Sequence, residues 1–139
     1  MSFDLHVLLP DDTLPTTAEW QVHIDSLGCD VQLDPTLDLS VASGFSPATI
    51  RGRRSGFEIG VETADSWIAG DERRRSLAAP ASRVVTFTWG GRLAECACAM
   101  AAAAGLVRGW SAIAYDPQDD CSLDLEALID AFGACLPDL

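Results

Sequence analysis

The chain has 139 residues, of which 48% are hydrophobic and 22% charged, the usage of a soluble globular protein rather than a disordered chain. Its formal net charge is −12, and all nine basic residues are arginine. This balance excludes a general nucleic-acid binder and a protein that adheres to anionic membranes, because both need a surplus of positive charge. We therefore expect one domain over residues 1–139, with neither nucleic acid nor membrane as a partner.

The charge is unevenly distributed along the chain. The first fifty residues hold eight acidic side chains and no basic one, and residues 109–139 hold seven and none. All nine arginines fall in residues 51–108, beside six acidic residues. If the two ends of the chain lie near each other, one side of the protein is strongly negative and attracts basic partners; otherwise the charge serves solubility alone.

Targeting and cofactor signals are not found in the sequence. The first residues lack the basic stretch and apolar core of a secretory signal, and the longest uncharged apolar run, residues 96–107, is shorter than a membrane span. Five cysteines have no zinc-type or redox-type spacing. We expect a cytoplasmic protein with reduced cysteines, no disulfide, and no bound metal, nucleotide or haem.

The first half of the chain begins with clear elements and continues with weaker ones. Alternating apolar residues predict a strand over residues 3–9. A capping-box spacing predicts a helix over residues 17–27. Short extended pieces are expected at residues 30–33 and 37–41, and the glycine-rich residues 43–56 are expected to form a loop or the tip of a hairpin.

The second half alternates strands with helices. Strands are predicted over residues 57–63, 83–89 and 111–115, and residues 65–82 are expected to be irregular. The alanine-rich residues 92–107 predict a helix buried on more than one side, because so little of its surface is polar. A polar turn and a cap at Ser122 precede a last helix over residues 123–135. Together these elements predict an α+β fold, with a mainly antiparallel sheet and helices packed on it.

No catalytic motif is found in the sequence. His6 lies on the predicted first strand, on the face opposite its apolar residues, and His23 falls on the surface of the first helix. Gly90 and Gly91 precede a helix, but no phosphate-loop pattern follows them. The carboxylates after Tyr115 do not follow the calcium-loop pattern. Arginines 51, 53 and 54 and arginines 73–75 could bind a phosphate or a carboxylate, or could neutralise acidic residues of the same chain.

One stretch carries a resemblance to known proteins. From Trp89-Gly90-Gly91 the chain runs through the alanine-rich helix to Tyr115-Asp116-Pro117-Gln118-Asp119-Asp120. This pattern, about a quarter of the chain, resembles the C-terminal half of small bacterial domains, some of which are similar to the immunity proteins of toxin–immunity pairs. The resemblance implies a protein that works by binding, and it implies no catalytic residue.

Three functions follow as hypotheses. The first is a cytoplasmic immunity-type inhibitor that covers a basic surface or active site of a toxin. Its expected partner-binding residues are all aspartates: Asp11, Asp12, Asp116, Asp119 and Asp120. The second is a small enzyme or ligand-binding domain with a pocket near His6 or the arginine loops, and the third is a scaffold or oligomerisation domain with exposed apolar surface.

Overall fold

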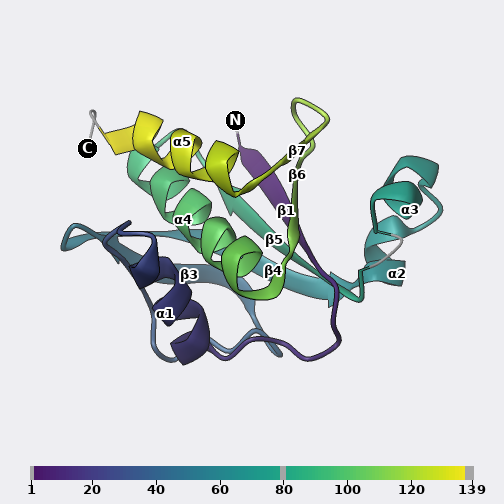
Figure 1. The fold of residues 1–139 in the computed structure, drawn as a ribbon, viewed down its shortest axis with the longest axis horizontal. Coiled ribbons are helices and arrows are strands. Elements are labelled where there is room, and N and C mark those ends of the chain that lie inside the picture. The colour runs from purple at the N-terminus through teal and green to yellow at the C-terminus, as the bar shows by residue number, and fades with distance from the viewer. Residues whose placement is uncertain (1, 79–80, 137–139) are drawn as a thin grey trace.

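The computed structural model describes residues 2–78 and 81–136, which form a seven-stranded antiparallel sheet and five helices (Figure 1). The prediction of an α+β fold with a mainly antiparallel sheet is confirmed. The sheet order is β2-β3-β4-β5-β1-β6-β7. The strands are β1 Phe3–Leu9, β2 Val31–Leu33, β3 Ser43–Ile50, β4 Arg53–Thr63, β5 Arg83–Trp89, β6 Ile113–Asp116 and β7 Cys121–Leu123. The helices are α1 Thr17–Ser26, α2 Ala64–Ile68, α3 Glu72–Ala78, α4 Leu93–Trp110 and α5 Leu125–Cys135.

The helices cover the two faces of the sheet unequally. Helices α1, α4 and α5 lie on one face, with α4 in the middle, while α2 and α3 pack at one end of the other face (Figure 1). The alternation along β1 explains this arrangement, because successive side chains point to opposite faces. Leu5 and Val7 join the large core under α4, whereas Leu8 joins a smaller cluster with Trp67 of α2.

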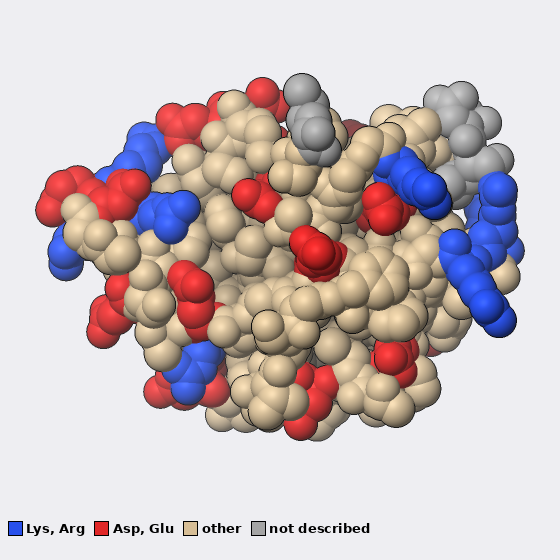
Figure 2. Space-filling model, turned by 180° about the vertical axis from the view of Figure 1, so that it is seen from behind, with Lys and Arg blue, Asp and Glu red and all other residues tan. Residues whose placement is uncertain are grey.

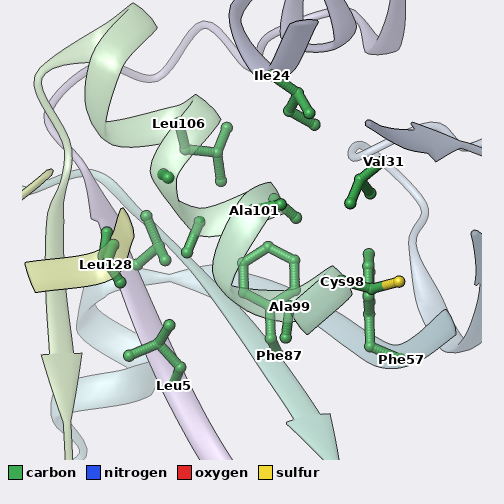
Figure 3. Packing of buried hydrophobic residues seen from close by; sticks show 14 of the residues in the cluster. Leu5, Ile24, Val31, Phe57, Phe87, Cys98, Ala99, Ala101, Leu106 and Leu128 are labelled. Atoms are coloured by element: carbon green, nitrogen blue, oxygen red, sulfur yellow. The ribbon is translucent and has the colours of Figure 1, made fainter. Parts of the chain in front are cut away.

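Helix α4 is the centre of the large core. Its residues from Ala101 to Leu106 are all buried, so the prediction that this helix is buried on more than one side is confirmed. Figure 3 shows aliphatic and aromatic side chains gathered around it from α1, α5 and the sheet. By length and composition α4 could span a membrane, but more than half of its residues are buried inside the protein.

Helix α1 packs directly against α4. The Trp20 indole nitrogen donates a hydrogen bond of 2.8 Å to the Ala102 carbonyl, and Gly105 leaves room for Ile24. Thr16 caps α1 with the predicted capping box, so the prediction for this helix is confirmed. His23 is half-buried against Trp110, with ring centroids 5.1 Å apart, and the expectation of a surface histidine is only partly correct.

Residues 43–56 were expected to be a loop or the tip of a hairpin, and residues 65–82 to be irregular; the hairpin is confirmed, but both stretches hold more regular structure than expected. Residues 43–50 and 53–56 belong to β3 and β4, and only Arg51 and Gly52 form the hairpin tip. Their positive φ angles, 51° and 76°, are those of a tight two-residue hairpin turn. The glycine-rich composition was misleading because Gly56 lies inside β4, where the Phe45 ring would clash with any Cβ at 2.6 Å.

The stretch from residue 65 to residue 82 holds two short helices, and residues 79–80 lie outside the described residues. The Thr63 hydroxyl caps α2 by accepting a hydrogen bond from the Ser66 N–H, and the Asp71 carboxylate accepts one from the Arg74 N–H in the first turn of α3. Helices this short show no apolar periodicity, and tertiary contacts of Trp67 stabilise them instead.

Three smaller expectations are also wrong. Residues 37–41 form a turn rather than a strand, because the Asp38 carboxylate accepts hydrogen bonds from the backbone and hydroxyl of Ser40. The strand predicted over residues 111–115 was expected to be the last one, but β7 follows it and extends the sheet by one strand. The last helix begins with Asp124 as its cap, not Ser122, since the Asp124 carboxylate accepts from the Ala127 N–H at 2.8 Å.

Candidate functional site

The structure divides the five expected partner-binding aspartates into two groups. Asp11 and Asp12 follow the last residue of β1, whereas Asp116, Asp119 and Asp120 lie in or beside the β6–β7 turn. That turn is near the beginning of β1, because Tyr115 pairs with His6 in the antiparallel register. A seven-residue strand is roughly 20 Å long, so the two groups lie at opposite ends of β1.

The β6–β7 turn is held by its own side chains and by β1. The Asp116 carboxylate accepts a hydrogen bond of 2.9 Å from the Gln118 N–H. In the amide orientation that satisfies both of its polar atoms, the Gln118 side chain donates to the Asp4 carbonyl at 3.0 Å and accepts from the Asp4 N–H at 3.1 Å. The turn is therefore fixed against the first residues of β1, and its carboxylates have a defined position.

Asp120 differs from the other aspartates of the turn because its carboxylate is bound by two side chains of the same chain. Tyr115 donates a hydrogen bond of 2.6 Å to its carboxylate, and Arg73 of α3 forms an ion pair with the same oxygen at 2.8 Å. These two hydrogen bonds, that of Tyr115 first, lower the pKa of Asp120. By contrast, the Asp119 carboxylate makes no hydrogen bond or ion pair with another described residue.

A cleft of about 540 Å³ lies beside this turn, and we call it the acidic cleft. It is enclosed by the beginning of β1, the end of β5, the first turns of α4 and the β6–β7 turn. Its walls are apolar: Phe3, Leu5, Trp89, Leu93, Cys96 and Met100. The polar side chains that line it are those of Arg92, Asp116, Gln118 and Asp119, whereas the Asp4 carboxylate points to the opposite face of β1 and bonds to Thr88. Among the described residues, the carboxylates of Asp116 and Asp119 face the Arg92 guanidinium, so the cleft is negative.

The aromatic wall of the acidic cleft is formed by two paired strands. Phe3 pairs with Trp89 in the β1–β5 register, and their rings stack with centroids 6.1 Å apart. Leu93 is the more exposed part of the wall, at 39% of its surface. Burial and the neighbouring Cys135 raise the pKa of Cys96 to about 12, so this thiol stays protonated at neutral pH and is a poor nucleophile.

A second, larger cleft of about 890 Å³ lies where β2 ends, between the β3–β4 hairpin and α4. We call it the hairpin cleft. Arg54 and Arg92 line it together with Asp34 and Glu95, so opposite charges are balanced in it. Glu95 lies in the first turn of α4 and its carboxylate lies close to Gly90, which leaves the positive end of this helix already facing an anion.

His6 lies away from both clefts. Its ring is 7% exposed beneath Trp67, with ring centroids 5.2 Å apart, and a hydrogen bond of 2.7 Å joins its Nδ1 to the Thr86 hydroxyl. Burial, and then the positive charge of Arg74, lowers the pKa of His6 to about 4. The imidazole is therefore neutral at physiological pH and is enclosed between the sheet and α2, which gives no support to a pocket at this residue.

The arginine clusters lie at opposite ends of the molecule. Arginines 51, 53 and 54 are at or near the β3–β4 tip, and arginines 73–75 belong to α3. Figure 2 shows basic side chains at the two sides of the rear face, with acidic side chains between and around them. Arg73 neutralises Asp120 within the chain, as one of the sequence alternatives proposed.

The sequence named part of the acidic cleft and missed the rest. Asp116 and Asp119 were expected, and Gly90 and Gly91 were noted as a turn before a helix. Phe3 and Trp89 were not connected to them, although an aromatic residue at the beginning of one strand and another at the end of a later strand could have suggested a pair. Among the described residues, no three His, Cys, Asp or Glu side chains are grouped so as to hold a metal ion.

Comparisons with protein-family models, with curated proteins and with solved structures found no match for this chain.

Proposed function

We propose that this protein is a cytoplasmic binding protein that holds a basic protein partner against the acidic cleft and the β6–β7 turn. An immunity-type inhibitor, which covers a basic active site of a toxin, is the specific form of this activity that we favour. One observation carries the proposal: the Asp119 carboxylate, which bonds to no other described side chain, lines an apolar cleft together with Asp116 in a protein of net charge −12.

The physical argument combines attraction over distance with contact. The overall negative charge raises the rate at which a basic partner meets this surface, and the field extends about 10 Å at 0.1 M salt. Apolar walls beside charged residues supply the contact, since interfaces combine buried aromatic anchors with a polar rim. Five free cysteines suit a reducing compartment.

The test begins with a partner captured on immobilised protein from the lysate of the source cells. The association rate of the purified partner is then measured at low and at physiological salt. We expect the rate to fall as salt rises, and we expect Asp119→Arg to slow it about tenfold at low salt. Asp12→Arg makes the same change of charge at the other end of β1, and its effect on the rate should be clearly smaller.

Asp119→Arg is the suitable variant because the side chain is exposed and bonds to no other described residue. The substitution should therefore change the free energy of unfolding little. A rate that is indifferent to salt, or equal effects of the two reversals, contradicts the proposal that this turn recognises a basic partner.

The hairpin cleft favours a second candidate function, a small-molecule binding domain. Its two arginines and two acidic residues match a ligand that carries both charges, such as a free amino acid. Thermal unfolding in millimolar amino acids tests this function. This function is supported if the amino acid raises the Tm of the wild type and of Asp119→Arg but not that of Arg54→Gln. An unchanged Tm of the wild type contradicts it.

A further inference from the structure

We infer that the acidic cleft binds a long basic side chain of the partner, arginine above lysine, with its apolar stem between Phe3, Trp89 and Leu93 and its cation at Asp119. This inference rests on the proposed function and names the chemical group that the partner inserts. Both the shape and the charge of the cleft support it.

The volume and the walls fit an apolar stem that carries one planar charged group. A cleft of about 540 Å³ is within the usual range of sites for small ligands, so one large side chain fits inside it. The Phe3 and Trp89 rings stack with centroids 6.1 Å apart and form an apolar wall for the stem. Met100 adds a flexible apolar contact that adapts to the stem.

The carboxylates differ in how many of their oxygens remain without a hydrogen bond to another described residue. The Asp4 carboxylate lies on the opposite face of β1, where it accepts a hydrogen bond of 2.7 Å from the Thr88 hydroxyl, and one oxygen of Asp116 accepts from the Gln118 N–H. Asp119 has both oxygens free of other described side chains, which is what a guanidinium needs for two parallel hydrogen bonds.

Arg92, the one cationic side chain among the described residues that line the cleft, sets the direction of the bound side chain. Arg92 belongs to the beginning of α4, whereas Asp116 and Asp119 belong to or adjoin the β6–β7 turn. A cationic group is repelled by Arg92 and attracted by the turn, so its charged end lies at the turn and its stem along Leu93. An anionic guest would meet the carboxylates of Asp116 and Asp119, and a neutral guest would leave Asp119 without a partner.

The experiment uses three probes that share one stem and differ in charge: pentylguanidinium, pentanol and hexanoate. Each is titrated into the full-length protein while backbone amide signals are followed by NMR. We expect pentylguanidinium to bind most tightly and to shift the amides of Gly90, Gly91, Leu93 and Gln118. Pentanol should bind the same place several-fold more weakly, and hexanoate more weakly still.

Single-residue variants then test which carboxylate pairs with the cationic probe. Asp119→Asn should weaken pentylguanidinium about threefold to tenfold and leave pentanol unchanged, because only the ion pair is lost. Asp12→Asn removes the same charge from the other end of β1 and should change neither affinity. Equal affinities for the cationic and neutral probes, shifts confined to other amides, or equal effects of the two variants overturn the inference.

This outcome is separable from that of the proposed function. If association with the partner depends on salt and on Asp119 but the cleft binds no guanidinium probe, only the inference about the inserted side chain is overturned. If the cleft binds the probe but the rate of association with the partner does not change with salt, the proposed function is overturned.

Discussion

Arg73 of α3 donates a hydrogen bond of 2.8 Å to the Asp120 carboxylate, and this ion pair joins the α2–α3 segment to the β6–β7 turn. Both side chains are more than half exposed. The pair therefore contributes little to the free energy of unfolding, since water and salt screen it. Its consequence is local: the Asp120 carboxylate is occupied within the chain, whereas that of Asp119 bonds to no other described residue.

The ionisation of Tyr115 reports this pair directly, because Tyr115 is the single tyrosine of the chain. The hydrogen bond to Asp120 raises the pKa of Tyr115, and Arg73 partly opposes that rise. We expect Asp120→Asn to bring the pKa of Tyr115 down toward its ordinary value and Arg73→Ala to raise it further. Ultraviolet absorbance titration measures both changes.

Arg75→Ala is the matched control for the titration, because it removes the same charge from the same helix without touching Asp120. The Tyr115 pKa in this variant should equal that of the wild type. If Arg73→Ala and Arg75→Ala titrate alike, the ion pair seen in the structure is not formed in solution.

The buried His6 predicts a loss of stability in mild acid. Its pKa is about 4 in the folded protein, against about 6.5 in an unfolded chain. The unfolded state therefore binds a proton first as the pH falls, and this group lowers the free energy of unfolding between pH 6.5 and pH 4. The loss is at most about 3 kcal/mol, with no further contribution from His6 below pH 4.

Denaturant unfolding at pH 7.5, 5.5 and 4.5 measures this effect, with His6→Gln as the comparison. The variant is less stable at neutral pH, but its stability should change less over this range than that of the wild type. A second variant, Trp67→Leu, opens the cover over the ring, and the His6 pKa measured by NMR should then rise toward 6.5. Parallel pH profiles for wild type and His6→Gln rule out this histidine as the cause.

The sequence predicted the elements whose signals are local. The Thr16–Glu19 capping box marked the beginning of α1, and the alternation of Phe3, Leu5 and Val7 marked β1. The polar turn after Tyr115 was also expected, and two of its aspartates line the acidic cleft. These features depend on neighbours within a few residues, so composition and spacing were sufficient.

The features that the sequence did not predict depend on distant contacts. Trp67 folds α2 onto the sheet only because β1 lies between β5 and β6, where it places His6 beneath the indole. The aromatic wall of the acidic cleft likewise needs Phe3 opposite Trp89, a pairing of residues far apart in the chain. Spacing along the chain carries no information on such pairings, which the antiparallel register sets.

Two glycines in helices should respond in opposite ways to substitution by alanine. A Cβ on Gly105 would lie 2.7 Å from Cγ1 of Ile24 and 3.1 Å from the Trp20 ring. Both side chains are fully buried, and the hydrogen bond of Trp20 to Ala102 fixes its position, so neither can move away easily. Overpacking costs about 1–3 kcal/mol, which exceeds the gain in helix propensity of about 1 kcal/mol.

Gly133 of α5 is the matched control, because a Cβ there meets nothing within 4 Å. We expect Gly105→Ala to lower the free energy of unfolding by about 1 kcal/mol and Gly133→Ala to raise it by up to about 1 kcal/mol, since the second substitution gains propensity without a clash. Urea unfolding of the two variants and the wild type measures the difference. A Gly105→Ala variant as stable as Gly133→Ala would show that α1 and α4 pack less closely than the contact between Gly105 and Ile24 requires.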